Sequence, residues 1–166
     1  MFLAEEQWGN HEMCFRKKAL TKGAGGELVI RIADDKEIPS LIGVFRESIL
    51  GSCEKEYTVR QREAWVSRGS YRRFKELLAK FQFFLAETGE QAVGFTSISE
   101  QGYLHSLFVL PESQRKGVAT ALTEEAIRFA LKAGAETLSA EVSKTALPFF
   151  MRLEFSSTAG TTGSVG

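Results

Sequence analysis

Residues 103–133 read YLHSLFVLPESQRKGVATALTEEAIRFALKA, and this stretch decides how the chain folds. Its first part, residues 103–109, is dense in apolar side chains and predicts a buried strand. Residues 118–132 carry apolar side chains at helical spacing, and Gly134 follows as a C-terminal stop, so they predict a long amphipathic helix. The start of that helix then lies at the end of a strand, where unpaired backbone N–H groups attract an anion.

The composition limits the class of protein. With 166 residues, 43% of them apolar and 25% charged, the chain is long enough for one globular domain that needs no disulfide or metal to fold. Lys plus Arg and Asp plus Glu each number 21, which argues against a polyanionic partner such as nucleic acid. The apolar runs are too short to span a membrane, and no signal-peptide pattern opens the chain, so we expect a cytoplasmic protein.

The cysteines and histidines predict no metal site. Cys14 and Cys53 lie far apart, and the chain has only 2 histidines, so neither a Cys-x-x-Cys nor a paired-histidine pattern occurs. His11 lies near Cys14 but lacks further ligands. We expect both cysteines to be reduced thiols.

Three segments differ in composition. Residues 1–26 show no clear period and end in GAGG, so they predict an N-terminal leader. Residues 27–155 predict one α/β domain. Residues 156–166, SSTAGTTGSVG, are of low complexity and predict a tail without a strand.

The sequence of residues 27–155 predicts a mixed, mostly antiparallel sheet flanked by helices. Four β-rich segments predict strands at residues 28–32, 81–86, 92–98 and 103–109. Gly89 suits the tight turn of a hairpin between the second and third of these strands. Residues 137–143 predict a further strand, which follows a strand and a helix and therefore lies parallel to residues 103–109.

Two capping boxes predict helices in the first half of the domain. Asp34 with Glu37 opens one helix, and Thr58 with Gln61 opens another that carries Trp65. A short last helix is expected over residues 146–153. The segment between residues 60 and 80 is basic, with Arg60, Arg62, Arg68, Arg72, Arg73, Lys75 and Lys80. This segment is interpreted either as a solvated helical surface or as a rim for an acidic substrate or a cofactor phosphate, and Trp65 either as core or as a pocket wall.

The loop before the long helix predicts a pyrophosphate site. Gly117 allows close approach of the backbone, and Arg115 and Lys116 add positive charge beside the helix N-terminus. The loop lacks the G-K-[ST] ending of a P-loop, and the chain has no G-x-G-x-x-G motif of a dinucleotide fold.

The order of motifs identifies a family resemblance. Val109-Leu110-Pro111 is followed by Gln114-x-x-Gly117-x-Ala119, a helix, a strand, and Ala146-x-x-Phe149-Phe150-x-x-Leu153-x-Phe155. This closely resembles the GNAT superfamily of N-acetyltransferases, whose pattern is L-x-V-x-P, Q/R-x-x-G-x-G/A and A-x-x-F-Y-x-x-x-G-F. The resemblance covers residues 103–155 tightly and residues 27–69 more loosely. It implies a GNAT-type sheet whose parallel strand pair splays apart at the cofactor site.

The resemblance implies acetyl-CoA as cofactor. The pantetheine arm would pair with the strand at Leu107, Phe108 and Val109, and Ser143 lies near a position where many relatives have an Asn that contacts this arm. Residues 28–69 would shape the pocket for a small-molecule amine or an exposed amino group. The pyrophosphate would contact Gln114, Arg115, Lys116, Gly117, Val118, Ala119 and Thr120.

The implied reaction is direct attack of an amine on the thioester. An amine with the pKa of a free lysine needs about 4.6 kcal/mol to lose its proton at pH 7, so a base matters. His105 is the candidate base, because strand alternation places Tyr103, His105 and Leu107 on one face. The strand also resembles the arylalkylamine N-acetyltransferases, with Tyr103 where those have a second histidine. The alternative is that His105 is a hydrogen-bonded residue below the cleft, and a strand N–H near Val109 is expected to stabilise the thioester carbonyl.

Two departures from the family pattern leave alternatives open. Phe150 occupies the position of the Tyr that protonates the departing thiolate in many relatives, so the acid is Tyr57, Tyr103 or solvent. The chain also lacks the usual strand pattern after the last helix, and Glu154 replaces a Gly. The alternative function is a CoA-binding module without activity. The open sheet edge would be covered by the leader or by a partner chain, which predicts a homodimer.

Overall fold

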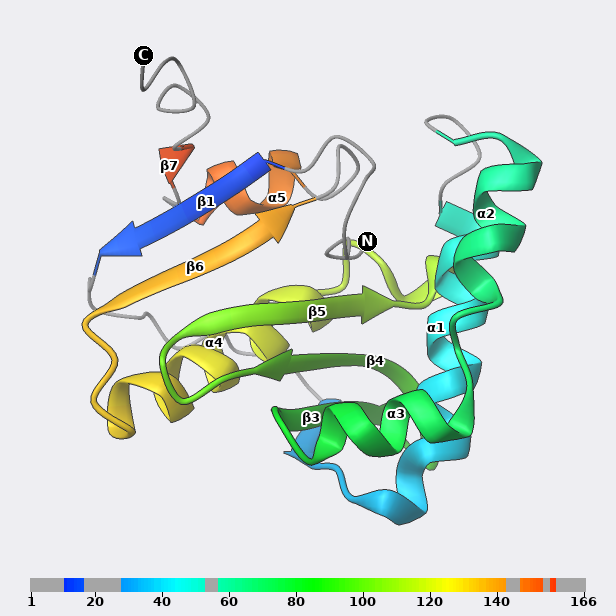
Figure 1. The fold of residues 1–166 in the computed structure, drawn as a ribbon, viewed down its shortest axis with the longest axis horizontal. Coiled ribbons are helices and arrows are strands. Elements are labelled where there is room, and N and C mark those ends of the chain that lie inside the picture. Colours follow the sequence, from blue (N-terminus) through cyan, green and yellow to red (C-terminus); the bar gives the residue numbers. More distant parts are fainter. Residues whose placement is uncertain (1–10, 17–27, 53–56, 143–146, 154–155, 158–166) are drawn as a thin grey trace.

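The computed structural model describes residues 11–16, 28–52, 57–142, 147–153 and 156–157. Within these residues the strands form one seven-stranded sheet in the order β2-β3-β4-β5-β6-β1-β7 (Figure 1). The strands are β1 (His11–Arg16), β2 (Leu28–Ile32), β3 (Gln82–Thr88), β4 (Gln91–Ile98), β5 (Tyr103–Val109), β6 (Thr137–Val142) and β7 (Ser156–Ser157). All pairs are antiparallel except β5 with β6, so the predicted fold class is confirmed.

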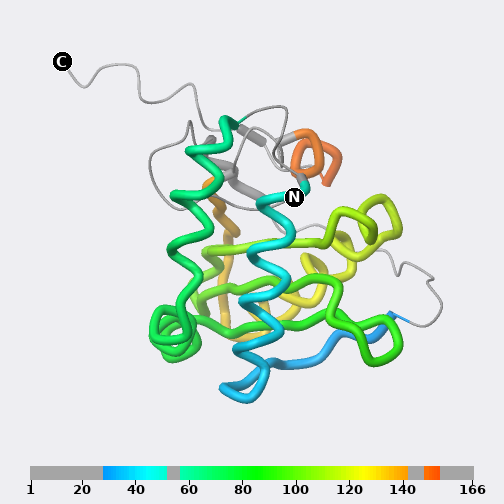
Figure 2. The backbone as a smooth tube through the Cα atoms, turned by 90° about the vertical axis from the view of Figure 1, so that its right-hand side faces the viewer, coloured from blue at the N-terminus to red at the C-terminus, as the bar shows by residue number. Residues whose placement is uncertain are grey.

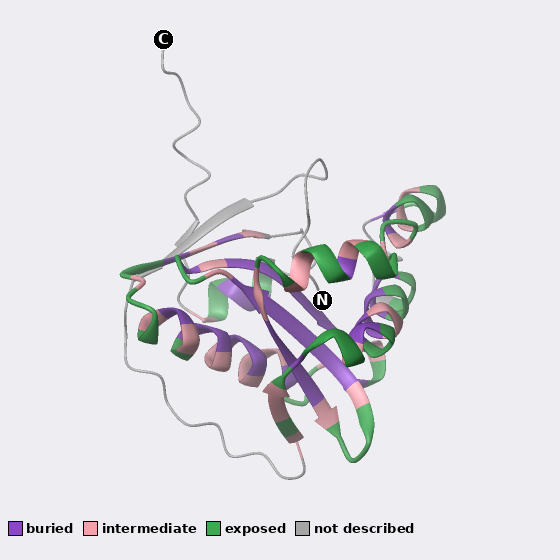
Figure 3. Cartoon of the chain, turned by 60° about the horizontal axis from the view of Figure 1, so that its bottom comes forward, coloured by how far each residue is buried: buried purple, intermediate pink, exposed green. Residues whose placement is uncertain are grey.

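The helices cover both faces of the sheet. The helices are α1 (Ile38–Ser52), α2 (Val59–Val66), α3 (Tyr71–Leu78), α4 (Val118–Lys132) and α5 (Leu147–Arg152). Figure 2 shows α1 and α2 side by side, running across the strands. Alternate residues of β3 separate the two layers, since Phe83 packs with α1 and α3 whereas Phe84 packs with α4. The strands between the two layers are buried, and each helix has an exposed outer side (Figure 3).

The predicted helix starts are confirmed, and one helix was missed. Both capping boxes form, with Asp34 before the short 3-10 turn (Asp35–Glu37) that leads into α1 and Thr58 before α2. The basic segment contains a second helix, α3, because the side chain of Ser70 caps a new helix by accepting from Arg73 N–H. In the sequence the only sign that a second helix begins here is Ser70, a residue type that often caps helices.

The N-terminal segment contributes a strand. β1 lies antiparallel to β6, so this part of the predicted leader covers the edge of β6, which is one of the two alternatives that the sequence left open. The prediction of a tail without a strand is wrong for Ser156 and Ser157, which pair with β1. Backbone pairing needs no side-chain pattern, so the composition of the tail did not reveal it. The remaining residues of the leader and the tail lie outside the described ranges.

A partly exposed ion cluster joins β2, β3 and the 3-10 turn before α1. Arg31 donates Nε and Nη2 to the two carboxylate oxygens of Glu87, both at 2.8 Å, and Nη1 to Glu37 at 2.9 Å. The other oxygen of Glu37 accepts the backbone N–H of Asp34 at 2.8 Å. This backbone hydrogen bond and the charge of Arg31 lower the pKa of Glu37 to about 2.

We expect Glu37→Gln to lower the free energy of unfolding at pH 7 by about 1 kcal/mol, because the partly exposed ion pair loses its charge. A carboxyl whose folded pKa is depressed stabilises the fold above its unfolded pKa, and this contribution disappears as pH falls from about 4.5 toward 2. Urea unfolding at pH 7 and at low pH should therefore show a smaller acid dependence in the variant. Glu76→Gln is the matched control, since Glu76 forms an exposed pair with Arg72. Equal losses in the two variants would contradict the role of the cluster.

Candidate active site

Strands β5 and β6 pair only where β5 begins, against the middle of β6. Tyr103 faces Ser139 and Leu104 faces Ala140, and no later ladder pair joins these strands among the described residues. Figure 1 shows β5 and β6 diverging toward their carboxyl ends. The predicted splayed strand pair is therefore present.

The backbone of β5 offers hydrogen-bond donors to the gap. Leu110 N–H donates to Val93 O at 2.8 Å, so the backbone of Leu110 faces β4. Alternation along a strand then directs the N–H groups of Leu107 and Val109 away from β4, toward the gap beside β6. An extended ligand arm could pair with these groups as an added strand.

The N-terminus of α4 lies beside this gap. Gly117 precedes the helix with φ +81°, and a Cβ built on it would meet no heavy atom within 4 Å. Arg115 also has a positive φ of 59°, so the loop bends sharply before the helix begins. Gly94 lets the start of α4 approach β4, because a Cβ there would lie 3.1 Å from Leu122 and 3.2 Å from Val118. The first amides of α4 therefore face open space at the end of the sheet.

A cavity of about 690 Å³ occupies this space. Of the residues predicted to bind the cofactor, those that line it are Val109, Gln114, Arg115, Gly117, Val118, Ala119 and Thr120. The prediction missed Pro148, Phe149, Arg152 and Leu153 of α5 and its end, although Phe149 and Leu153 belong to the last motif.

Other predicted cofactor residues lie elsewhere. The side chain of Leu107 is buried in the core with α4, and that of Phe108 points to the opposite face of the sheet. Both residues therefore contribute only backbone to the gap. Lys116 is exposed and does not line the cavity, and Ser143 lies outside the described residues.

The chemistry of this cavity fits coenzyme A. Amides at a helix N-terminus and the guanidinium of Arg115 suit a pyrophosphate, and the open space at Gly117 admits it without a clash. Backbone donors of β5 suit the amide groups of pantetheine. Apolar Phe149 and Leu153 suit its carbon atoms.

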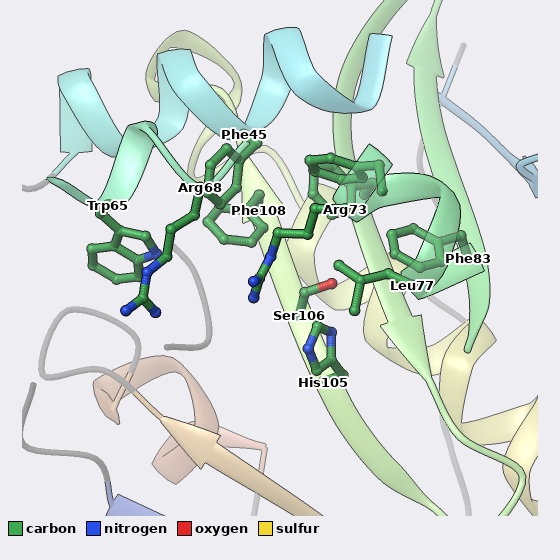
Figure 4. A pocket seen from close by; sticks show the side chains of 11 residues that line it. Phe45, Trp65, Arg68, Arg73, Leu77, Phe83, His105, Ser106 and Phe108 are labelled. Atoms are coloured by element: carbon green, nitrogen blue, oxygen red, sulfur yellow. The ribbon is translucent and has the colours of Figure 1, made fainter. Parts of the chain in front are cut away.

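A second, smaller pocket lies on the other face of β5. Its cavity volume is about 30 Å³, and Phe108 lines it whereas the next residue, Val109, lines the larger cavity. Successive strand residues point to opposite faces, so the end of β5 separates the two pockets. Figure 4 shows the side chains that surround it: Phe45, Trp65, Arg68, Arg73, Leu77, Phe83, His105, Ser106 and Phe108, with Phe74 and Phe95 completing the lining. Trp65 is thus both buried and a pocket wall.

His105 lies at the side of this pocket because β5 contains a bulge. The register of β4 against β5 changes from Ser97 opposite Ser106 to Ile98 opposite Leu104, so His105 is an extra residue. The prediction that His105 and Leu107 share one face is wrong, since His105 lines the small pocket and Leu107 packs with α4.

The imidazole of His105 is held by its neighbours. Its Nδ1 and Ser97 Oγ share a hydrogen bond at 3.1 Å, and Ser97 Oγ also bonds to Ser106 Oγ. Phe81 stacks on the ring with centroids 4.3 Å apart. Burial lowers the pKa of His105 to about 4, and the charge of Arg73 acts in the same direction. The imidazole is therefore neutral at pH 7 and can accept a proton.

The two predicted acids differ in their position. Tyr103 begins β5 and lies six residues before Val109, about 20 Å along an extended strand, so its place argues against protonating a thiolate near Val109. Tyr57 is buried with its ring 5.7 Å from that of Trp65, a wall of the small pocket. Phe150 is fully buried in the core.

Two further observations concern metal sites and membrane-spanning helices. Among the residues described, no cluster of three or more His, Cys, Asp or Glu could hold a metal ion. None of the helices in the described ranges has the length and hydropathy to cross a bilayer.

Comparison with known proteins gives consistent matches. The family model of the acetyltransferase (GNAT) domain matches residues 53–165. An uncharacterized N-acetyltransferase of Escherichia coli K12, YafP, is 35% identical over 126 residues, which are 76% of this chain and 79% of YafP. An uncharacterized N-acetyltransferase of Archaeoglobus fulgidus is 33% identical over 128 residues, covering 70% of this chain and 82% of that protein.

Solved structures share the fold. A GCN5-related N-acetyltransferase from Rhodopseudomonas palustris superposes with a TM-score of 0.74 at 22% identity, over 80% of this chain and 84% of that one. With the motifs of the α4 loop and the matching family model, the chain belongs to the GNAT acetyltransferases, enzymes that use acetyl-CoA as acetyl donor.

Proposed function

We propose that this protein transfers the acetyl group of acetyl-CoA to the primary amine of a small molecule. The observation that carries the proposal is the pair of pockets on opposite faces of β5, which are lined by the consecutive residues Phe108 and Val109 at the end of β5 that does not pair with β6. Acetyl-CoA supplies an electrophilic thioester carbonyl. One pocket would hold the cofactor and the other the acceptor, with the gap between the strands connecting them. The homodimer and the cytoplasmic location stay predictions.

The cofactor would be held mainly by backbone. The amides from Arg115 to Thr120 and the side chains of Gln114 and Arg115 would bind the pyrophosphate. The N–H groups of Leu107 and Val109 would pair with the pantetheine arm, and the N–H of Val109 would stabilise negative charge on the carbonyl oxygen. Lys116, which is exposed and outside the cavity lining, would add only long-range attraction.

His105 would accept the proton that the amine loses. The imidazole is neutral, lines the acceptor pocket and is fixed by Ser97, as a positioned base requires. A base with a pKa near 4 is weak, so the amine must arrive largely as the free base or lose its proton as the new bond forms.

The proposal is tested by thiol release. Purified protein with acetyl-CoA and a panel of small primary amines should release free thiol and form N-acetyl products, read by a thiol reagent and mass spectrometry. Acetyl-CoA at 100 times its dissociation constant should add about 2.7 kcal/mol of stability. Tight CoA binding with no thiol release on any amine would overturn the proposal and favour the alternative, a CoA-binding module.

A further inference from the structure

We propose that the acceptor carries a carboxylate beside its amine and a small apolar group, as an α-amino acid with an apolar side chain does. This inference rests on the proposed function and names the substrate class of the same pocket. It is carried by the charges and the walls of the small pocket around Phe108.

The side chains that line the pocket are positively charged or uncharged, and the carboxylate of Glu141, which is outside the lining, acts on His105 from nearby. The cationic side chains in the described lining are Arg68 and Arg73, and none of the residues that line it is Asp or Glu. His105 adds no charge at neutral pH, because burial keeps its pKa near 4. An acceptor with several ammonium groups would be repelled here, whereas one with a carboxylate would be attracted.

The two arginines lie five residues apart, with Arg68 in the turn between α2 and α3 and Arg73 in the first turn of α3. Figure 4 shows the side chain of Arg73 extending toward Ser106 and His105 of β5, whereas the side chain of Arg68 extends beside Trp65. Gly69 allows the turn to pack closely against α1, because a Cβ at this position would lie 2.7 Å from the ring of Phe45. The turn is thereby fixed above the pocket. Guanidinium groups bind carboxylates by two parallel hydrogen bonds, which suits recognition of a small anion.

The walls suit a small apolar group. Phe45 packs edge-on against Phe108 at 5.0 Å and against Phe74 at 5.8 Å, so the aromatic lining is built by mutual contacts within the protein. The cavity between these rings has a volume of about 30 Å³, which leaves room for a few atoms. The amine would then lie between this apolar end and the gap, with the carboxylate toward the arginines.

The experiment compares amino acids with their own carboxamides. The kcat/KM values of L-alanine, L-valine and L-methionine are measured against those of the three carboxamides with acetyl-CoA. We expect the best acid to exceed its carboxamide by about tenfold or more, the loss typical of removing a charged hydrogen-bond partner. The carboxamide has the less basic amine, so ionisation of the amine cannot produce this preference.

Variants assign the preference to the pocket. Arg68→Gln and Arg73→Gln should each lower kcat/KM for the acid about tenfold and leave the carboxamide little changed. Arg72→Gln is the matched control, because Arg72 lies beside Arg73 on α3 but is not part of the pocket lining. The side chain of Arg72 is 90% exposed. The thermal shift with CoA checks that each variant is folded.

The outcomes separate this inference from the proposed function. Equal turnover of acids and carboxamides, or a preference that survives both arginine variants, would overturn the inference while acetyl transfer stands. If no amine is acetylated, the thermal shift of the CoA complex by each amino acid is the readout. A shift that depends on Arg68 and Arg73 would support carboxylate recognition although the proposed function fails, and its absence would overturn both.

Discussion

Replacing Gly117 with valine is expected to abolish the stabilisation of this protein by acetyl-CoA and to weaken binding by about 100-fold or more, equivalent to about 2.7 kcal/mol. Gly117 has φ +81°, and the space around its missing Cβ is open on the side of the large cavity. A β-branched side chain would occupy the space where the pyrophosphate approaches and would strain the start of α4. The thermal shift with acetyl-CoA and titration calorimetry measure both effects.

Gly134→Val is the matched control for this substitution. Gly134 follows the other end of α4 with φ +99°, and a Cβ there would also meet no heavy atom within 4 Å. Both variants therefore carry a similar backbone penalty, of about 1–2 kcal/mol in the unliganded protein. Only Gly117→Val should lose the response to acetyl-CoA. A normal response in Gly117→Val, or an equal loss in the control, would show that the cofactor does not approach this loop.

The sequence alone predicted the regular part of the fold. Strand β5 has the predicted bounds, and the capping boxes at Asp34 and Thr58 form with both of their reciprocal hydrogen bonds. These features are local, because a cap needs only residues three positions apart and a buried strand only an apolar run. Strand β1 depends on pairing with β6, which is more than 100 residues away in the sequence, so no local sequence pattern predicted it.

The site was predicted in part for the same reason. The loop from Gln114 to Thr120 is contiguous, and its residues line the cavity except Lys116. The bulge at His105 could not be predicted, because β5 is covered on both faces and its residues show no alternation that would identify the extra one. The smaller pocket draws its lining from α1, α2, α3, β3, β4 and β5, which no local pattern brings together, and two arginines of the basic segment are part of that lining.

His105→Ala is expected to lower kcat/KM for the preferred amine by about 100-fold, the lower end of the usual range for a general base, because a pKa near 4 makes the imidazole a weak one. The response to acetyl-CoA should be unchanged, since His105 does not line the large cavity. Between about pH 5.5 and 9 the wild-type imidazole stays neutral. The rise of kcat/KM with pH should therefore follow only the deprotonation of the amine substrate, without an inflection near pH 6.5 from the imidazole.

His105→Asn distinguishes a proton acceptor from a packing residue. Asparagine is planar and can keep a hydrogen bond to Ser97 Oγ, but it has no basic nitrogen. If His105 accepts the proton, the Asn variant should be as slow as the Ala variant while its melting temperature stays closer to that of wild type. If His105 only fills the space between Phe81 and the bulge, Asn should restore turnover, and the proton would then leave through water. The turnover of Ser97→Ala should lie between that of wild type and that of His105→Ala, because this substitution removes the hydrogen bond that holds the imidazole but keeps the imidazole itself.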